Sequence, residues 1–183
     1  MRRVLALLAL LVAGALVGAT ARKLGLRINL SPSIPIGIYV ARPLRANEHN
    51  IARGALVAIC LDHPLAAWGR SRGYLRRGSC PDGSSPVGKP VFATEGDTIG
   101  VTRDGLSRNH VHISRTRPLD VDATGHRLPR VPPGRYLVAP DEIWIVSTYD
   151  PRSWDSRYYG PVRLTTVISL LRPLWVIRSR SGR

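Results

Sequence analysis

The chain has 183 residues, enough for one domain with a core of its own behind an N-terminal segment. Its formal charge is +15, but the basic residues are scattered and accompany no recognised nucleic-acid-binding motif, which argues against a nucleic-acid partner. The two cysteines lack the paired ligand spacing of a structural metal site, so no metal is expected.

Residues 1–23 have the composition of a membrane segment. An uncharged run from Val4 to Ala21 is preceded by two arginines and followed by Arg22 and Lys23. A transmembrane helix needs roughly 17 to 25 apolar residues, whereas the apolar part of a signal peptide has about 7 to 15. The length favours an uncleaved anchor, although the Ala19-Thr20-Ala21 end also fits a cleaved signal. Either alternative places residues 24–183 on the periplasmic side of a bacterial inner membrane.

Short apolar stretches between prolines and glycines predict a mainly β body. No window beyond residue 25 sustains the spacing of an amphipathic helix for three turns. The predicted strands are Gly37 to Val40, Ala55 to Leu61, Pro90 to Ala93, Tyr136 to Ala139 and Ile143 to Val146.

Two polar stretches, Asp62 to Pro86 and Ser114 to Pro133, are predicted to be loops. The apolar end from Val162 to Ile177 is interrupted by Pro173 and is too short for a second span. It is expected to form core strands or, alternatively, a membrane-facing edge.

Cys60 and Cys80 fit a disulfide in an oxidising compartment, where closing a loop of this length contributes roughly 3 kcal/mol. A zinc site that uses His63 is the weaker alternative because its spacing is wrong. Setting aside the four basic residues of the N-terminal segment leaves a body charge of +11, which is expected to attract anionic lipids of the inner membrane.

The lysine count singles out one candidate for acid–base chemistry. Only Lys23 and Lys89 are lysines among the 27 basic residues, so the body contains a single lysine. Arginine does not lose its proton in proteins, whereas a desolvated lysine can act as a base. On an extended segment Val87, Lys89 and Val91 share one face, which would keep the amine dry.

A base of this kind needs a nucleophile, and the segment Ser31-Pro32-Ser33-Ile34-Pro35 supplies two serines in a stretch made rigid by two prolines. Taken alone, the segment also fits a turn between the anchor and the first strand. Two further segments add to it: Lys89 is followed by Glu95-Gly96-Asp97, and residues 153–160 read Ser-Trp-Asp-Ser-Arg-Tyr-Tyr-Gly.

In this order the motifs resemble the bacterial type I signal peptidases, which use a Ser/Lys dyad, from about Ser31 to Val162. The Ser-Pro-Ser-x-Pro-x-Gly-x-Tyr segment and the two cysteines before the lysine are most similar to the conjugative-transfer, TraF-like branch. The resemblance implies a signal-peptidase-like antiparallel β-sheet domain over residues 24–183, behind one N-terminal transmembrane helix.

The resemblance also implies roles for individual residues. Ser33 would be the nucleophile and Lys89 the general base, while Ser31 and the Ser33 backbone N–H would hold the oxyanion. Ser153 would orient the lysine amine, and Asp155 with Arg157 would brace the site, although these two also fit an ordinary surface pair.

Some positions depart from the family pattern. Ile34 stands where methionine is usual, Pro90 follows the lysine in place of arginine, and the Gly-Asp-Asn before the last motif is missing. None of these positions is assigned to proton transfer, so a dedicated substrate is expected rather than loss of the dyad.

The implied activity is cleavage of leader peptides from exported precursors through an acyl-enzyme, without a cofactor. For the TraF-like branch the substrate would be a conjugative pilin precursor, with cyclisation as a further possible outcome. Two alternatives stay open: a housekeeping signal peptidase, and a non-catalytic membrane-tethered scaffold of a secretion complex.

Overall fold

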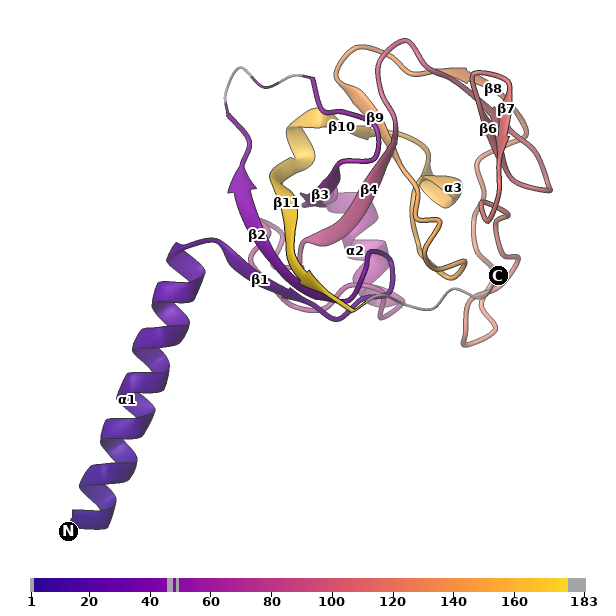
Figure 1. The fold of residues 1–183 in the computed structure, drawn as a ribbon. Helices are drawn as coiled ribbons and strands as arrows, with labels where there is room; N and C mark the ends of the chain where they lie inside the picture. The colour runs from indigo at the N-terminus through magenta and orange to yellow at the C-terminus, as the bar shows by residue number, and fades with distance from the viewer. Residues whose placement is uncertain (1, 46–47, 49, 178–183) are drawn as a thin grey trace.

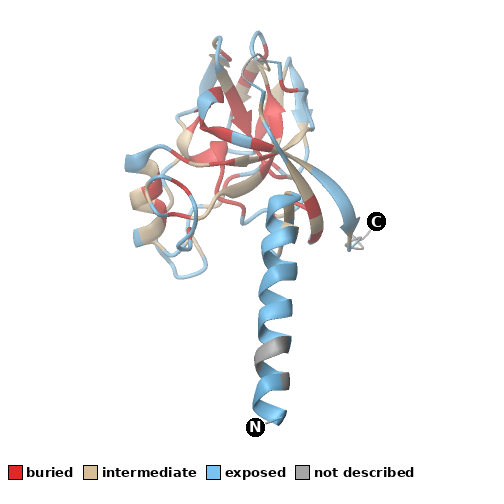
Figure 2. Ribbon diagram, turned by 90° about the vertical axis from the view of Figure 1, so that its left-hand side faces the viewer, coloured by how far each residue is buried: buried red, intermediate tan, exposed pale blue. Residues whose placement is uncertain are grey.

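The N-terminal helix stands apart from a β-rich body in the computed structural model, which describes residues 2–45, 48 and 50–177 (Figure 1). Helix α1 (Arg2–Lys23) has 22 residues, a length of about 33 Å, which matches the roughly 30 Å hydrocarbon core of a bilayer. Its described side chains are exposed except for the half-buried Ala21 (Figure 2). The helix is long and apolar enough to cross a membrane, as the anchor prediction requires.

The body contains a seven-stranded sheet and a four-stranded sheet, and every strand pair in them is antiparallel. The larger sheet has the order β1-β2-β11-β3-β4-β9-β10, and the smaller one β7-β6-β5-β8. The larger sheet comprises β1 (Leu26–Asn29), β2 (Gly37–Pro43), β3 (Leu56–Ile59), β4 (Val87–Ala93), β9 (Glu142–Ile145), β10 (Val162–Arg163) and β11 (Val167–Val176). The smaller sheet comprises β5 (Thr98–Val101), β6 (Leu106–Arg108), β7 (Val111–Ile113) and β8 (Gly134–Leu137).

The mainly β prediction is confirmed, and all five predicted strands are present with ends that differ by a few residues. Strands β1, β5, β6, β7 and β10 were not predicted. They have two to four residues each, which is too short for the alternation of apolar and polar side chains to stand out. The Ser114–Pro133 stretch is a loop as predicted, apart from one isolated bridge between Val121 and Arg127.

The prediction of a continuous loop from Asp62 to Pro86 is wrong, because the segment begins with α2 (His63–Ser71). Pro64 lies in the first turn, where its missing N–H costs no hydrogen bond. Ala66 and Gly69 face the core, and an alanine methyl at position 69 would meet the Trp154 ring at 2.6 Å. A nine-residue helix with so few apolar side chains has too little periodicity to be recognised from sequence.

The apolar C-terminal stretch divides into two parts. Leu164 in the 3₁₀ turn η1 (Leu164–Thr166) and Val167 are buried in the core. Leu174 and Trp175 are exposed, and the pairing of β11 with β2 shifts register after Pro173. The core prediction therefore holds for the first part; the second part is exposed, and the alternative of a membrane-facing edge stays a prediction for it.

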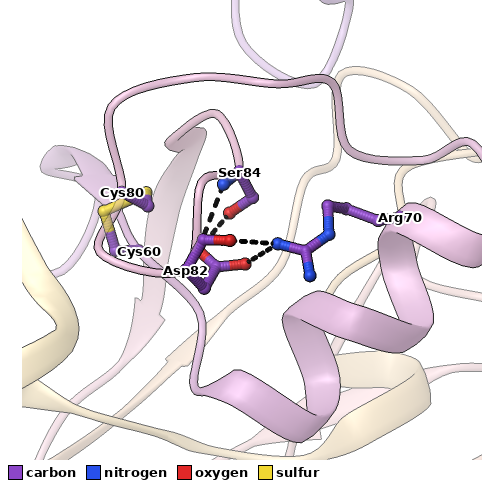
Figure 3. Close-up of a disulfide and its surroundings, with 5 residues drawn as sticks. All are labelled: Cys60, Arg70, Cys80, Asp82 and Ser84. Atoms are coloured by element: carbon purple, nitrogen blue, oxygen red, sulfur yellow. Dashed lines mark hydrogen bonds and ion pairs between the residues drawn. A yellow bond between two sulfur atoms is a disulfide. The ribbon is translucent and has the colours of Figure 1, made fainter.

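A disulfide joins Cys60 and Cys80 as expected, which removes both thiols from the zinc alternative (Figure 3). Next to it, Arg70 on α2 lies 2.5 Å from the carboxylate of Asp82, which also accepts hydrogen bonds from Ser84. The disulfide and the ion pair fix the loop that leads from α2 into β4. They therefore support the strand that carries Lys89.

We predict that replacing both cysteines by serine lowers the free energy of unfolding by roughly 3 kcal/mol, since the bond closes a loop of 20 residues. The measurement is guanidinium unfolding of the full chain in detergent, followed by tryptophan fluorescence. The wild-type chain under reducing conditions is the control and should unfold like the double variant. A difference below about 1 kcal/mol would contradict this contribution.

Candidate active site

Three side chains from distant parts of the sequence meet beside β4, an inner strand of the larger sheet. Ser33 lies in the loop between β1 and β2, Lys89 at the centre of β4, and Ser153 in the loop before α3 (Ser156–Tyr159). The Lys89 Nζ atom lies 2.8 Å from Ser33 Oγ and 2.5 Å from Ser153 Oγ. All three residues are buried. The structure therefore brings together the residues expected from sequence to be nucleophile, base and orienting hydroxyl.

The Lys89 amine is held in a dry environment. The residue is 4% exposed, and on β4 it lies between two residues of the same face, the buried Val91 and the half-buried Val87. Across the β3–β4 ladder it is paired with the fully buried Val57. Desolvation is the largest effect and lowers the pKa of Lys89 from 10.5 to about 8. A large fraction of the amine is therefore neutral near pH 8, where it can accept a proton.

The loop that carries Ser33 rests directly on β4. Ile34, the next residue, is buried, and its Cδ1 would lie 2.9 Å from a methyl group placed on Gly88. Only a glycine at position 88 leaves room for this contact. The isoleucine that departs from the family pattern thus fills a gap beside Lys89 and helps to hold Ser33 against the amine.

Ser31 lies beside the nucleophile candidate. The Ser33 backbone N–H donates to Ser31 Oγ over 3.4 Å, a long and weak hydrogen bond. A serine hydroxyl and a backbone N–H are both donors that can stabilise an oxyanion. Their proximity is compatible with the expected oxyanion role, because the long bond between them is easily exchanged for a stronger acceptor.

Asn29 is a positioning residue that the sequence analysis missed. Its Nδ2 donates to the backbone oxygens of Ser31, Ile34 and Pro35 over 2.8, 3.2 and 3.1 Å. Its Oδ1 accepts from the Ser31 N–H over 3.1 Å. One side chain at the end of β1 therefore fixes both ends of the loop around Ser33. An Asn two residues before a Ser-Pro segment is a known turn-forming signal that could have indicated this.

Asp155 and Arg157 form a buried brace, which excludes the surface-pair alternative. Arg157 Nε and Nη2 donate to the two carboxylate oxygens of Asp155 over 2.8 and 2.9 Å, and both residues are at most 1% exposed. Nη2 also donates to the backbone oxygen of Ser153 over 2.8 Å. Asp155 Oδ2 accepts from the Ser147 N–H over 3.0 Å, and Oδ1 accepts from the Arg157 N–H in the first turn of α3, which Asp155 caps. The pair holds the chain on both sides of Ser153 in place.

A cleft of about 790 Å³ opens onto these groups and is lined by Ser31, Ser33, Lys89 and Ser153. A second cleft, of about 1000 Å³, begins at the C-terminal end of α1 and is lined by Arg22 and Lys23. Both clefts are also lined by Ile28, Asn29, Pro86 and Gly88, so they meet next to Ser33.

The arrangement has the parts needed for nucleophilic attack: a hydroxyl, an amine that can be neutral, a group that orients the amine, and adjacent donors for a developing negative charge. His110 and His112 lie in the turn and strand of the β6–β7 hairpin of the smaller sheet and take no part. Among the described residues, no group of three or more His, Cys, Asp or Glu is arranged to hold a metal ion.

Comparisons with known proteins give a family match and several relatives. The family model described as signal peptidase, peptidase S26, matches residues 1–175. The chain is 36% identical to a conjugal transfer protein TraF of Agrobacterium tumefaciens over 157 residues, 82% of each chain. It is 30% identical to a plasmid transfer protein TraF of Escherichia coli over 167 residues, 91% of this chain and 89% of that one. A solved signal peptidase I of Enterococcus faecalis is 18% identical, with a TM-score of 0.38 over 66% of this chain and 96% of that chain.

We predict that Asn29→Asp loosens the loop around Ser33. The substitution keeps the acceptor for the Ser31 N–H but replaces three donated hydrogen bonds by contacts between a carboxylate and carbonyl oxygens. Amide hydrogen exchange in residues 31–36 should become at least tenfold faster. Asn109→Asp, which disrupts a hydrogen bond to Asp97 in another part of the body, is the matched control. Unchanged exchange in residues 31–36 of the Asn29 variant would show that other contacts hold the loop.

Proposed function

The chain belongs to the signal peptidase family S26, in its TraF-like branch, and we propose that it is a serine endopeptidase that removes leader peptides from exported precursors. The observation that carries the proposal is the buried contact of 2.8 Å between Lys89 Nζ and Ser33 Oγ. A base within hydrogen-bond reach of a hydroxyl is the first requirement for serine nucleophilic catalysis.

In the first step, neutral Lys89 takes the proton of the Ser33 hydroxyl while Oγ attacks the carbonyl carbon of the scissile peptide bond. The burial that lowers the pKa of Lys89 supplies the neutral amine. Negative charge develops on the carbonyl oxygen, and the Ser31 hydroxyl and the Ser33 N–H, which lie together, stabilise it.

In the second step, the carbon–nitrogen bond breaks, and the protonated Lys89 gives its proton to the departing amine of the mature protein. The leader peptide remains as an ester on Ser33. Lys89, neutral again, then activates a water molecule that hydrolyses the ester, or the acyl group passes to another amine. Throughout this cycle Ser153 keeps the lysine amine oriented, and the Asp155–Arg157 pair keeps Ser153 in place.

Support for the substrate comes from the relatives rather than from the site. Curated relatives carry the names plasmid transfer protein and conjugal transfer protein, which favours a precursor of a conjugation system, such as a pilin subunit, over general preproteins. If the bond cut lies on the C-terminal side of the subunit, the ester on Ser33 is formed by the subunit itself; attack by the subunit's own N-terminal amine would then break this ester, free Ser33 and yield a cyclic product. Helix α1 supports an anchored enzyme whose body works at the periplasmic face of the inner membrane.

We predict that Ser33→Ala and Lys89→Arg each reduce precursor processing by about a thousandfold or more, because the first removes the nucleophile and the second leaves a cation that cannot become a base. Processing is followed in cells that contain the transfer system. Ser114→Ala, at an exposed serine, is the matched control and should process normally. Normal processing by either dyad variant would rule out the mechanism.

We also predict that a small serine-directed acylating inhibitor labels Ser33 faster as the pH rises. The pKa of Lys89 is lowered to about 8, and only the neutral amine can accept the proton, so the rate should fall as the pH drops below 8. The rate constant for labelling of the full chain in detergent, measured from pH 6 to 10, tests this expectation. A labelling rate that does not depend on pH across this range would exclude Lys89 as the base.

A further inference from the structure

One wall of the cleft around Ser33 is formed by a short hairpin whose role the mechanism does not explain. This hairpin, residues 119–128, is closed by the bridge between Val121 and Arg127. The Leu128 N–H donates to the Asp120 oxygen over 3.0 Å, and the Asp122 N–H to the His126 oxygen over 2.9 Å. Leu119, Val121, Asp122, Ala123 and Leu128 all line the cleft.

The tip of the hairpin is fixed from within by a single carboxylate. Asp122 Oδ1 accepts hydrogen bonds from the backbone N–H groups of Thr124 and His126, over 2.8 and 2.9 Å, and from the Thr124 hydroxyl. The other carboxylate oxygen, Oδ2, lies 3.6 Å from His126 Nδ1 and also makes a contact outside the hairpin.

That contact joins the hairpin to the loop after α2, which also lines the cleft. Tyr74, in the loop after α2, donates its hydroxyl to Asp122 Oδ2 over 2.5 Å. The Tyr74 ring packs against Trp68 and Trp154, and the disulfide holds the same loop. At the base of the hairpin, the Leu119 N–H donates to Tyr158 Oη over 3.0 Å. The hairpin is thus attached at its tip and at its base, as a fixed wall of the cleft.

The position of α1 indicates in which direction a substrate chain runs through the two clefts. A leader peptide comes from the membrane, and the cleft at the C-terminal end of α1, lined by Arg22 and Lys23, is the one next to the bilayer. Leader residues that follow this cleft reach Ser33 where the two clefts meet. The residues after the scissile bond then continue into the second cleft, on the side of the hairpin.

The chemistry of the hairpin fits an uncharged peptide segment. Val121 is 46% exposed and, with Ala123 and Leu128, presents apolar surface to the cleft. Two arginines and two aspartates, Arg76, Arg152, Asp122 and Asp150, also line the cleft, so their charges balance. The Asp122 carboxylate is already occupied by Tyr74 and by the hairpin backbone.

We propose that the hairpin of residues 119–128 binds the first residues of the mature protein, those that follow the scissile bond, and selects an extended segment with small or apolar side chains. The inference rests on the proposed function, since it assigns a binding wall to the same cleft. Val121 is the specificity-determining residue, and Tyr74 is a positioning residue that holds the hairpin through Asp122.

The test compares Val121→Glu with Val111→Glu, a matched variant at an exposed valine on β7 of the other sheet. Two reactions are measured on the full chain in detergent: cleavage of a precursor peptide that extends past the scissile bond, and acylation of Ser33 by the small inhibitor. We expect Val121→Glu to lower kcat/KM for the precursor at least tenfold and to leave acylation within twofold. Val111→Glu should change neither reaction.

Tyr74→Phe provides a second test that does not place a charge in the cleft, and Tyr136→Phe, which removes a hydroxyl contact with the Pro132 oxygen, is its control. Loss of the Tyr74 contact should raise KM for the precursor with little change in kcat, because the hairpin is released while the dyad stays intact. A substrate that carries the same leader and only a small leaving group should be cleaved normally.

Other outcomes would overturn the inference. If Val121→Glu leaves precursor cleavage unchanged, the hairpin does not contact the substrate. If it slows cleavage and acylation equally, the hairpin acts on the dyad and not on the mature segment. Failure of the wild-type chain to react with the inhibitor would instead contradict the proposed dyad, and the inference with it.

Discussion

The exclusion of water from one amine is the constraint on which the rest of the site depends. A shift of the Lys89 pKa from 10.5 to about 8 corresponds to roughly 3 kcal/mol of lost stabilisation of the charged form. The sheet supplies this burial because β4 lies between β3 and β9, away from both edges. An amine on an edge strand or a loop would be solvated and protonated at neutral pH. The central strand therefore determines the chemistry available to the serine beside it.

The serine is placed differently from the lysine. Ser33 lies in a loop rich in proline, and a loop has no ladder of hydrogen bonds to fix it. Asn29 takes over that task with four hydrogen bonds, and Ile34 packs into the space left by Gly88. A rigid strand thus carries the proposed base, and a loop held by side chains carries the proposed nucleophile. The 2.8 Å contact requires both, since an error in either part would separate the two atoms.

Sequence reasoning identified the groups that meet at the site but not the contacts that hold them. Lys89 stood out because it is the sole lysine of the body, and Ser33 because of its motif. Strand alternation correctly placed Val91 on the same face as the lysine. Asn29 was missed because its role depends on three backbone oxygens that approach it only in the folded loop. The hairpin was missed because its attachment joins Tyr74 and Asp122, 48 residues apart in a stretch without periodicity.

The two members of the buried ion pair next to the site act on the pKa of Lys89 in opposite directions. Asp155 raises the pKa of Lys89 and Arg157 lowers it, so the two effects oppose each other. A lone carboxylate at position 155 would favour the protonated amine and work against a neutral base. Because Arg157 binds both oxygens of that carboxylate, the pair fixes the backbone of Ser153 while desolvation stays the dominant influence on the lysine. The hydrogen bonds of this pair offset the cost of burying two charges. They hold the chain around Lys89 without favouring the protonated form of its amine.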